Sequence, residues 1–190
     1  MTCSLAFVKP GATSVLADSY RSLVSEFVDH GEKLIPFVLS FPHEDFAALV
    51  ESLHACSHGT GPAQGWVAHT TFWLVRNDTE LVGVSNLRHS LTPALEREDG
   101  NIGYSVKPSA RRQGFGTRLL ELTLREASQR EMTELLLTCG KTNLASVRVI
   151  LRNGGVLESE EFLPRRGEVV QRYRIRSIGH ATADARSASH

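Results

Sequence analysis

Apolar positions recur every three to four residues in several stretches of the chain, which is the spacing of one buried helix face. The clearest stretch follows Phe115, where Leu119 and Leu122 fall on one stripe and neighbouring leucines widen it. A face of that width is typical of a helix that covers a sheet. The predicted helices comprise residues 14–30, 42–56, 117–130 and 143–152, with a short helical piece from Thr92.

Short apolar runs bounded by turn residues predict strands between these helices. Leu135, Leu136 and Leu137 follow one another without polar alternation, which is typical of a strand covered on both faces. Asn77 and Asp78 separate two apolar runs and favour a hairpin turn. The predicted strands comprise residues 5–8, 70–76, 81–88, 101–106, 132–139, 156–163 and 168–176.

The order of these elements indicates an α/β (α+β) protein. The strand at 101–106, the helix after it and the strand at 132–139 lie within about 40 residues, which predicts a crossover helix and a parallel pair of strands. We expect residues 1–178 to form a single domain, with residues 1–64 as its N-terminal helical part. Residues 179–190 are mostly small and polar, so we expect a disordered tail.

Composition narrows the class of protein. Of 190 residues, 41% are hydrophobic and 22% are charged, as in globular proteins, and no apolar run is long enough for a membrane helix. Lys plus Arg and Asp plus Glu both number 21, so charge gives no support for binding nucleic acid or a membrane surface. The N-terminus lacks the segments of a secretion signal and the three cysteines lack disulfide spacing, so we expect a cytoplasmic protein.

A basic loop that contains two glycines precedes the helix at 117–130. Arg111 and Arg112 come first, and Gly114 and Gly116 leave the main chain accessible to a ligand. Unbonded N–H groups and the positive end of a helix dipole favour an anion, and arginine matches the geometry of phosphate oxygens. We predict a pyrophosphate-binding loop; a solvated helix start is the alternative.

Other polar residues carry weaker signals. His54, Cys56 and His58 are of types that bind metals, but no fourth ligand accompanies them, so we expect no metal site. Glu98 and Asp99 are candidate general bases or part of a solvated charge run. His89 has a pKa suited to proton transfer, although a lone histidine is more often structural.

Three short motifs stand in a fixed order along the chain: Val106-Lys107-Pro108, Arg111-x-x-Gly114-x-Gly116, and Asn143-x-x-Ser146 with Asn153-Gly154. This order, with a hairpin before it and a buried strand within it, resembles motif A and the following elements of the GCN5-related N-acetyltransferases, the GNAT superfamily. The resemblance is strongest over residues 65–177, which look like a bacterial branch of predicted acetyltransferases with unassigned substrate.

The resemblance implies a mixed central sheet, splayed between two parallel strands at 101–107 and 132–139, with helices on both faces. Acetyl-CoA would lie in the splay as acyl donor, and its acetyl group would pass directly to an amine without a metal. The residues implied for cofactor binding are Tyr104, Ser105, Val106, Arg111, Arg112, Gln113, Gly114, Phe115, Gly116, Thr117, Asn143 and Ser146.

The chain departs from the family at the catalytic acid, because Ile150 stands where many relatives have a tyrosine. The candidate bases are Glu98, Asp99 and His89. The acid could be replaced by Ser146, Tyr173, Tyr104 or a water, or the thiolate could leave unassisted. We expect an N-acetyltransferase that acts on the primary amine of a small molecule. A protein N-terminus or lysine as acceptor, and a non-catalytic acyl-CoA-binding sensor, are the alternatives. Homodimer formation is left open.

Overall fold

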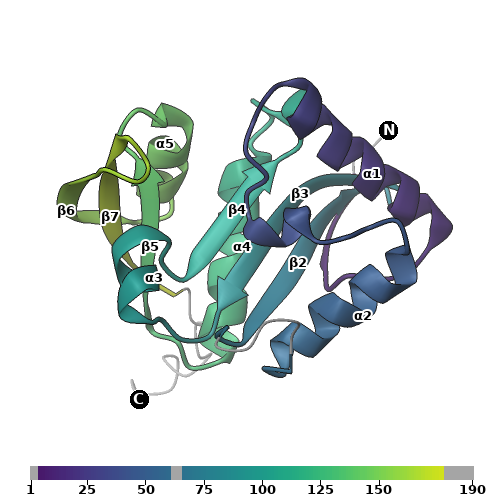
Figure 1. Cartoon of the computed structure of the whole chain (residues 1–190), viewed down its shortest axis with the longest axis horizontal. Coiled ribbons are helices and arrows are strands. Elements are labelled where there is room, and N and C mark those ends of the chain that lie inside the picture. Colours follow the sequence, from purple (N-terminus) through teal and green to yellow (C-terminus); the bar gives the residue numbers. More distant parts are fainter. Residues whose placement is uncertain (1–3, 61–65, 178–190) are drawn as a thin grey trace, which may run out of the picture.

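Two antiparallel sheets diverge from one point in the computed structural model, which describes residues 4–60 and 66–177 (Figure 1). The predicted tail and part of the predicted loop at 57–65 lie outside these residues. In the first sheet the strand order is β1 (Leu5–Val8), β2 (His69–Arg76), β3 (Glu80–Arg88) and β4 (Ile102–Val106). In the second it is β5 (Glu134–Gly140), β7 (Glu168–Arg176) and β6 (Val156–Leu163).

Helices cover both faces of the first sheet, as predicted (Figure 1). The helices are α1 (Ser14–Asp29), α2 (Phe46–Ser57), α3 (Pro93–Glu98), α4 (Phe115–Gln129) and α5 (Leu144–Arg152), with 3-10 turns at Phe37–Ser40 (η1) and Pro108–Ala110 (η2). Helices α1 and α2 bury their apolar sides against β2 and β3, around Tyr20 and Trp73. Helix α4 packs on the opposite face through Leu119, Leu120 and Leu124, which are fully buried.

Two helices begin more than one residue from their predicted start. Helix α2 begins at Phe46 and not at Pro42, because the Asp45 side chain accepts a hydrogen bond from the N–H of Ala48 and caps the helix there. Helix α4 begins at Phe115, two residues earlier than predicted, directly after the left-handed Gly114. Both differences lie at helix ends, where apolar periodicity carries the least information.

Strands β4 and β5 belong to different sheets, so the predicted parallel pair is not confirmed as a ladder. Within the described residues every ladder is antiparallel, and β5 pairs with β7 instead. An isolated bridge between Gly100 and Leu137 joins the two sheets just before β4 begins. Beyond this bridge the two strands separate, and the splay that the sequence predicted lies between them.

Asn101 holds the point from which the sheets diverge. Its N–H donates to the Leu136 carbonyl (2.7 Å), and its side-chain oxygen accepts from the Leu136 N–H (2.8 Å). Its side-chain amide also donates to the Arg88 carbonyl (3.3 Å), while its own carbonyl accepts from the Arg88 N–H (2.8 Å). One buried side chain therefore connects β3 and β5 at the start of β4 and satisfies main-chain groups that a continuous ladder would otherwise pair.

The residue before Asn101 has to be glycine. Gly100 has a φ of +69°, and a Cβ atom at this position would lie 2.4 Å from the Leu136 carbonyl oxygen. The main chains of the two sheets thus approach each other more closely here than any side chain allows.

We expect Asn101→Ala to lower the free energy of unfolding by about 2 to 4 kcal/mol, because the buried Leu136 N–H loses its acceptor. Chemical denaturation measures the change. The control is Thr142→Ala, an exposed polar residue after β5, for which the change should stay within about 0.5 kcal/mol. Equal effects of the two substitutions would show that Asn101 does not hold the sheets together.

Candidate active site

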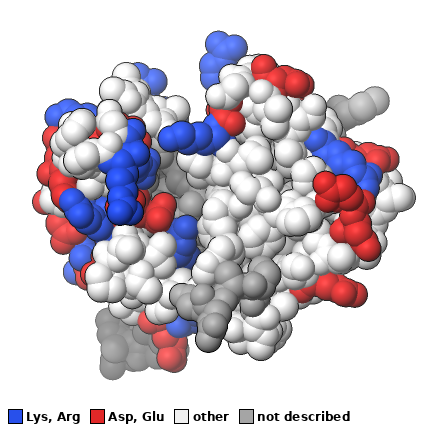
Figure 2. All heavy atoms as spheres, in the orientation of Figure 1, with Lys and Arg blue, Asp and Glu red and all other residues white. Residues whose placement is uncertain are grey.

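A cleft of about 710 Å³ occupies the space between β4 and β5. Figure 2 shows it as a hollow between two lobes, with Lys and Arg side chains around its rim. Its walls come from β4, the end of β5, the loop before α4, helix α5 and the segment between α1 and η1. Pro36 of that last segment packs on β4 at Gly103, where a Cβ atom would approach it to 3.2 Å.

The N-terminus of α4 opens into this cleft without a capping side chain. Gly114 is the N-cap residue with a φ of +84°, and no atom lies within 4 Å of the position that its Cβ would take. The N–H groups of Phe115, Gly116 and Thr117 donate to no carbonyl or side chain of residues 4–60 and 66–177. These donors, together with the helix dipole, suit an anion.

Gly116 borders the narrow part of the cleft. A Cβ atom here would meet Val149 of α5 at 3.3 Å and Val106 of β4 at 3.6 Å. The absence of a side chain at this position therefore keeps the gap between β4 and α5 free beside the helix N-terminus.

The two arginines of the loop differ in their surroundings. Arg111 forms a bidentate ion pair with Glu32 (2.7 Å for both contacts), and its Nε donates to the Val106 carbonyl at 3.2 Å. The hydrogen bonds from Arg111 to Glu32 lower the pKa of Glu32 below its ordinary value. Arg112 is exposed, has a left-handed φ of +63° and forms no ion pair within the described chain.

Two further arginines, which were not predicted from the sequence, border the cleft. Arg148 and Arg152 are one turn apart on α5 and line the same space as Asn143. The sequence did carry a signal for them. Arg148 and Arg152 are four residues apart on a predicted helix with Asn143 as its N-cap, so both lie on one side of that helix. Asn143 itself accepts a hydrogen bond from the Ser146 N–H at 3.1 Å and so caps α5.

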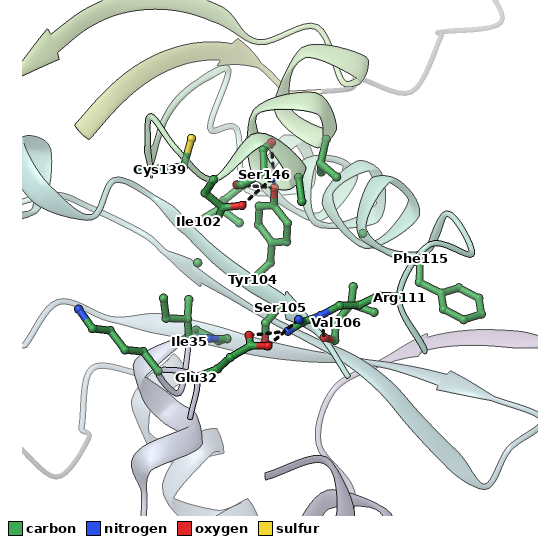
Figure 3. Close-up of a pocket in the computed structure, with 18 of the residues that line it drawn as sticks. Glu32, Ile35, Ile102, Tyr104, Ser105, Val106, Arg111, Phe115, Cys139 and Ser146 are labelled. Atoms are coloured by element: carbon green, nitrogen blue, oxygen red, sulfur yellow. Dashed lines mark hydrogen bonds and ion pairs between the residues drawn. The ribbon is translucent and has the colours of Figure 1, made fainter. Parts of the chain in front are cut away.

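Side chains of β4 alternate between the two walls of the cleft. Tyr104 points to α5, where its hydroxyl lies 2.9 Å from the Ser146 hydroxyl (Figure 3). Burial raises the pKa of Tyr104, so that the hydroxyl stays protonated at neutral pH. Ser105 faces the other way, and its buried hydroxyl has no hydrogen-bond partner in the described residues.

Cys139 of β5 also borders the cleft, beside Ser146 (Figure 3). Burial raises the pKa of its thiol to about 11, so the thiol is protonated at neutral pH. A protonated thiol is a weak nucleophile, which does not favour a covalent intermediate on this residue.

Of the twelve residues predicted to bind the cofactor, all but Gln113 line the cleft. The Gln113 side chain turns away and accepts a hydrogen bond from Arg76 at 3.2 Å. Among the candidate catalytic residues, the structure brings Asp99, Tyr104 and Ser146 to the cleft, but not Glu98, His89 or Tyr173. The others were predicted from residue type and order along the chain, which do not specify the direction of a side chain.

The remaining candidates lie elsewhere. The Tyr173 ring is buried in the core and its hydroxyl donates to Gln171 at 2.6 Å. The His89 imidazole lies 2.9 Å from the Thr70 hydroxyl, outside the residues that line the cleft. Glu98 contributes its carbonyl to hydrogen bonds from Thr138 and Arg166, while its neighbour Asp99 lines the cleft in its place.

Ile150 is fully buried in the core and does not border the cleft. Ile150, which stands where the family resemblance implies a tyrosine, therefore packs in the core. The Tyr104 hydroxyl instead reaches Ser146.

No helix of the described residues is long and apolar enough to cross a membrane. Within residues 4–60 and 66–177, no group of three or more His, Cys, Asp or Glu side chains is arranged to hold a metal ion.

Comparison with known proteins connects this geometry to one family. The model of the acetyltransferase (GNAT) family matches residues 36–154. Similar solved structures include RimL, a ribosomal-protein alpha-N-acetyltransferase in complex with coenzyme A, at 18% identity and a TM-score of 0.65, covering 90% of this chain and 92% of that chain. No curated protein matches the chain.

Two more similar structures come from Vibrio species. A ribosomal-protein-alanine acetyltransferase from Vibrio fischeri has 15% identity and a TM-score of 0.62, and the match covers 92% of this chain and 93% of that chain. A dodecameric spermidine N-acetyltransferase from Vibrio cholerae has 17% identity and a TM-score of 0.60, and the match covers 91% of this chain and 94% of that chain. At these identities the likeness concerns the fold, which is the one that the sequence resemblance implied.

We expect the ion pair between Glu32 and Arg111 to make stability depend on pH. Because the folded-state pKa of Glu32 is lowered, the pair stabilises the fold above the ordinary carboxyl pKa of about 4.3, and this contribution is lost as pH falls through the lowered pKa. Both side chains are partly exposed, so the contribution should stay below about 1 kcal/mol. Thermal melting between pH 6 and pH 3 should show a smaller loss of Tm for Glu32→Gln than for the unmodified protein.

The control for this measurement is Glu51→Gln, which removes an exposed carboxylate from α2 that forms no ion pair with the described residues. Parallel pH curves for Glu32→Gln and the unmodified protein would contradict a stabilising role of the pair.

Proposed function

Because the chain belongs to the acetyltransferase (GNAT) family, whose enzymes use acetyl-CoA as co-substrate, we propose that it transfers the acetyl group to the primary amine of a small molecule. The observation that carries this proposal is the uncapped N-terminus of α4 at the head of the cleft, with unbonded N–H groups beside Gly114 and Gly116. Such a site suits the diphosphate of coenzyme A. Residues 1–178 act as one catalytic domain in this proposal.

The diphosphate binds to the main-chain N–H groups from Gln113 to Thr117, and arginines supply counter-charge. Arg112, Arg148 and Arg152 border the cleft without an ion-pair partner among the described residues, so they are available to phosphate oxygens. Arg111 becomes available when it leaves Glu32, because phosphate and carboxylate compete for the same guanidinium fork.

The pantetheine arm runs along β4 in the gap that β5 leaves. The Asn101 carbonyl and the Lys107 N–H both form hydrogen bonds toward β3. Main-chain groups of a strand alternate in direction, so those of Tyr104 and Val106 face the opposite edge, where β5 is absent. The Val106 carbonyl on this edge accepts from Arg111 Nε at 3.2 Å. The other main-chain groups of the edge have no strand partner among the described residues and can receive the amides of the cofactor as an added strand would.

Acetyl transfer needs a deprotonated amine, a donor for the tetrahedral oxyanion and a proton for the leaving thiolate. The Val106 N–H serves as the oxyanion donor in our proposal. The amine nitrogen then forms a bond to the carbonyl carbon, the carbon–sulfur bond breaks, and the thiolate takes a proton from the Tyr104 hydroxyl. The position of Tyr104 in the cleft and its contact with Ser146 support this role. Asp99, one of the candidate bases, lines the cleft, and in our proposal it accepts the proton of the amine.

Gly116→Leu should lower the affinity for coenzyme A at least about tenfold, because the new side chain fills the gap between Val106 and Val149. Isothermal titration calorimetry with coenzyme A measures the affinity. The control is Gly11→Leu, at a position with no atom within 4 Å of the added Cβ and outside the cleft, which should bind normally. Unchanged affinity in a folded Gly116→Leu protein would refute the proposed cofactor site.

Tyr104→Phe should lower kcat by about tenfold or more with little change in KM for acetyl-CoA, because only the proton donor is lost. Release of free thiol from acetyl-CoA with a panel of amines measures the rate. Tyr173→Phe is the matched control, since its hydroxyl is buried away from the cleft, and its kcat should stay near that of the unmodified protein. If Tyr173→Phe alone lost activity, the two roles would be reversed.

The same amine panel also decides among acceptors. Turnover of small amines supports the proposal, and turnover confined to peptides that carry a free N-terminus or a lysine would favour a protein acetyltransferase. Coenzyme A binding without turnover of any amine or peptide would favour an acyl-CoA sensor.

A further inference from the structure

Arg88 is a buried cation at the end of the cleft opposite the pyrophosphate loop. It is the last residue of β3, its exposed fraction is 8%, and it lines the cleft together with Asp99. Its main chain is fixed on both sides by Asn101, through the Arg88 N–H (2.8 Å) and the Arg88 carbonyl (3.3 Å). The position of its side chain is therefore coupled to the point from which the two sheets diverge.

The guanidinium of Arg88 forms no ion pair with the described residues. It lies over the Phe37 ring, 5.2 Å from the centroid, and one N–H donates to the Gly100 carbonyl at 3.0 Å. No carboxylate of residues 4–60 and 66–177 lies within ion-pair distance. Exposed arginines of this protein, such as Arg111 and Arg174, do have glutamate partners.

A buried charge without an ion-pair partner is unfavourable, because its hydrogen bonds to water are lost. For Arg88, the hydrogen bond to the Gly100 carbonyl replaces them only in part. Burial accordingly lowers the pKa of Arg88, and only the negative charge of Asp99 nearby opposes this effect. Phe37 covers one face of the guanidinium and Gly100 takes one edge, so the cleft is the side from which another group can reach it. An anion that enters the cleft would supply the missing charge.

We propose that the acceptor is an amino acid or a similar amine that carries a carboxylate, and that Arg88 binds this carboxylate. The planar guanidinium matches the two oxygens of a carboxylate. Asp99, which lines the same end of the cleft, complements the ammonium group of the incoming acceptor. This inference rests on the proposed acetyltransferase function and specifies the class of its acceptor.

The test uses pairs of acceptors that differ only in the carboxylate. The twenty common amino acids are compared with their carboxamides in the thiol-release assay with acetyl-CoA. For the preferred acceptor, kcat/KM should be at least about tenfold higher with the carboxylate than with the carboxamide. This ratio should fall close to one in Arg88→Gln, through a higher KM for the acceptor and an unchanged KM for acetyl-CoA, and Arg88→Lys should retain part of it.

Arg125→Gln is the control for the loss of one arginine. It lies exposed on α4, pairs with Glu121 and does not border the cleft, so the ratio should stay at its original value. Thermal melting and titration with coenzyme A accompany each variant. Should Arg88→Gln fail to fold, the ratio in the unmodified protein and in Arg88→Lys decides the question.

The outcomes separate this inference from the proposed function. If the enzyme acetylates carboxamides as efficiently as amino acids and binds coenzyme A normally, the inference about the acceptor is overturned. The acetyltransferase function then remains intact. A preference for carboxylates that persists in both Arg88 variants would likewise overturn the role of Arg88. Failure to bind coenzyme A and to acetylate any amine would overturn both.

Discussion

The structure depends on the separation of two strands that follow each other around helix α4. Strands β4 and β5 would lose main-chain hydrogen bonds wherever they part, and buried N–H and C=O groups without partners are costly. Asn101 meets this constraint at the point of separation, because its side chain replaces a ladder bond to Leu136 while it also holds Arg88. Gly100 allows the close approach of the main chains that brings these groups together. Past this point the unpaired edge of β4 becomes the floor of a ligand cleft.

Much of the fold could be predicted from the sequence, because its signals are local. The bounds of β6 and β7 were predicted to the residue, since turn residues frame both strands. The consecutive leucines at 135–137 indicated a strand covered on both faces, and all three are buried. The glycine loop before α4 could be located because glycine placement and the start of a helix are both encoded within a few residues. The ladder between β4 and β5 was not confirmed, because a strand–helix–strand unit specifies neighbours in a sheet and not the hydrogen bonds between them.

The candidate site could be predicted only in part, because its polar contacts join residues far apart in the chain. Glu32 is 79 residues from Arg111, and Tyr104 is 42 residues from Ser146. No local pattern shows that Tyr104 reaches the helix where the family's tyrosine is replaced by Ile150. His89, Glu98 and Tyr173 have suitable chemistry, but the His89 ring contacts Thr70, the Tyr173 ring lies in the core, and Glu98 does not line the cleft. Residue type identified candidates, and only the three-dimensional arrangement could choose among them.

The two ends of the cleft handle charge in different ways, and this difference fits a reaction between two substrates. At the α4 end, main-chain N–H groups have no partner among the described residues and the arginines are exposed, so a highly charged ligand can bind and leave without stranding a buried ion. At the Arg88 end, one buried cation forms no ion pair with the described residues. In the proposed reaction, the first arrangement would provide affinity for acetyl-CoA, whereas the second would discriminate among acceptors, because a neutral analogue would leave the charge unpaired. The same asparagine supports both ends, since it opens the edge of β4 and anchors Arg88.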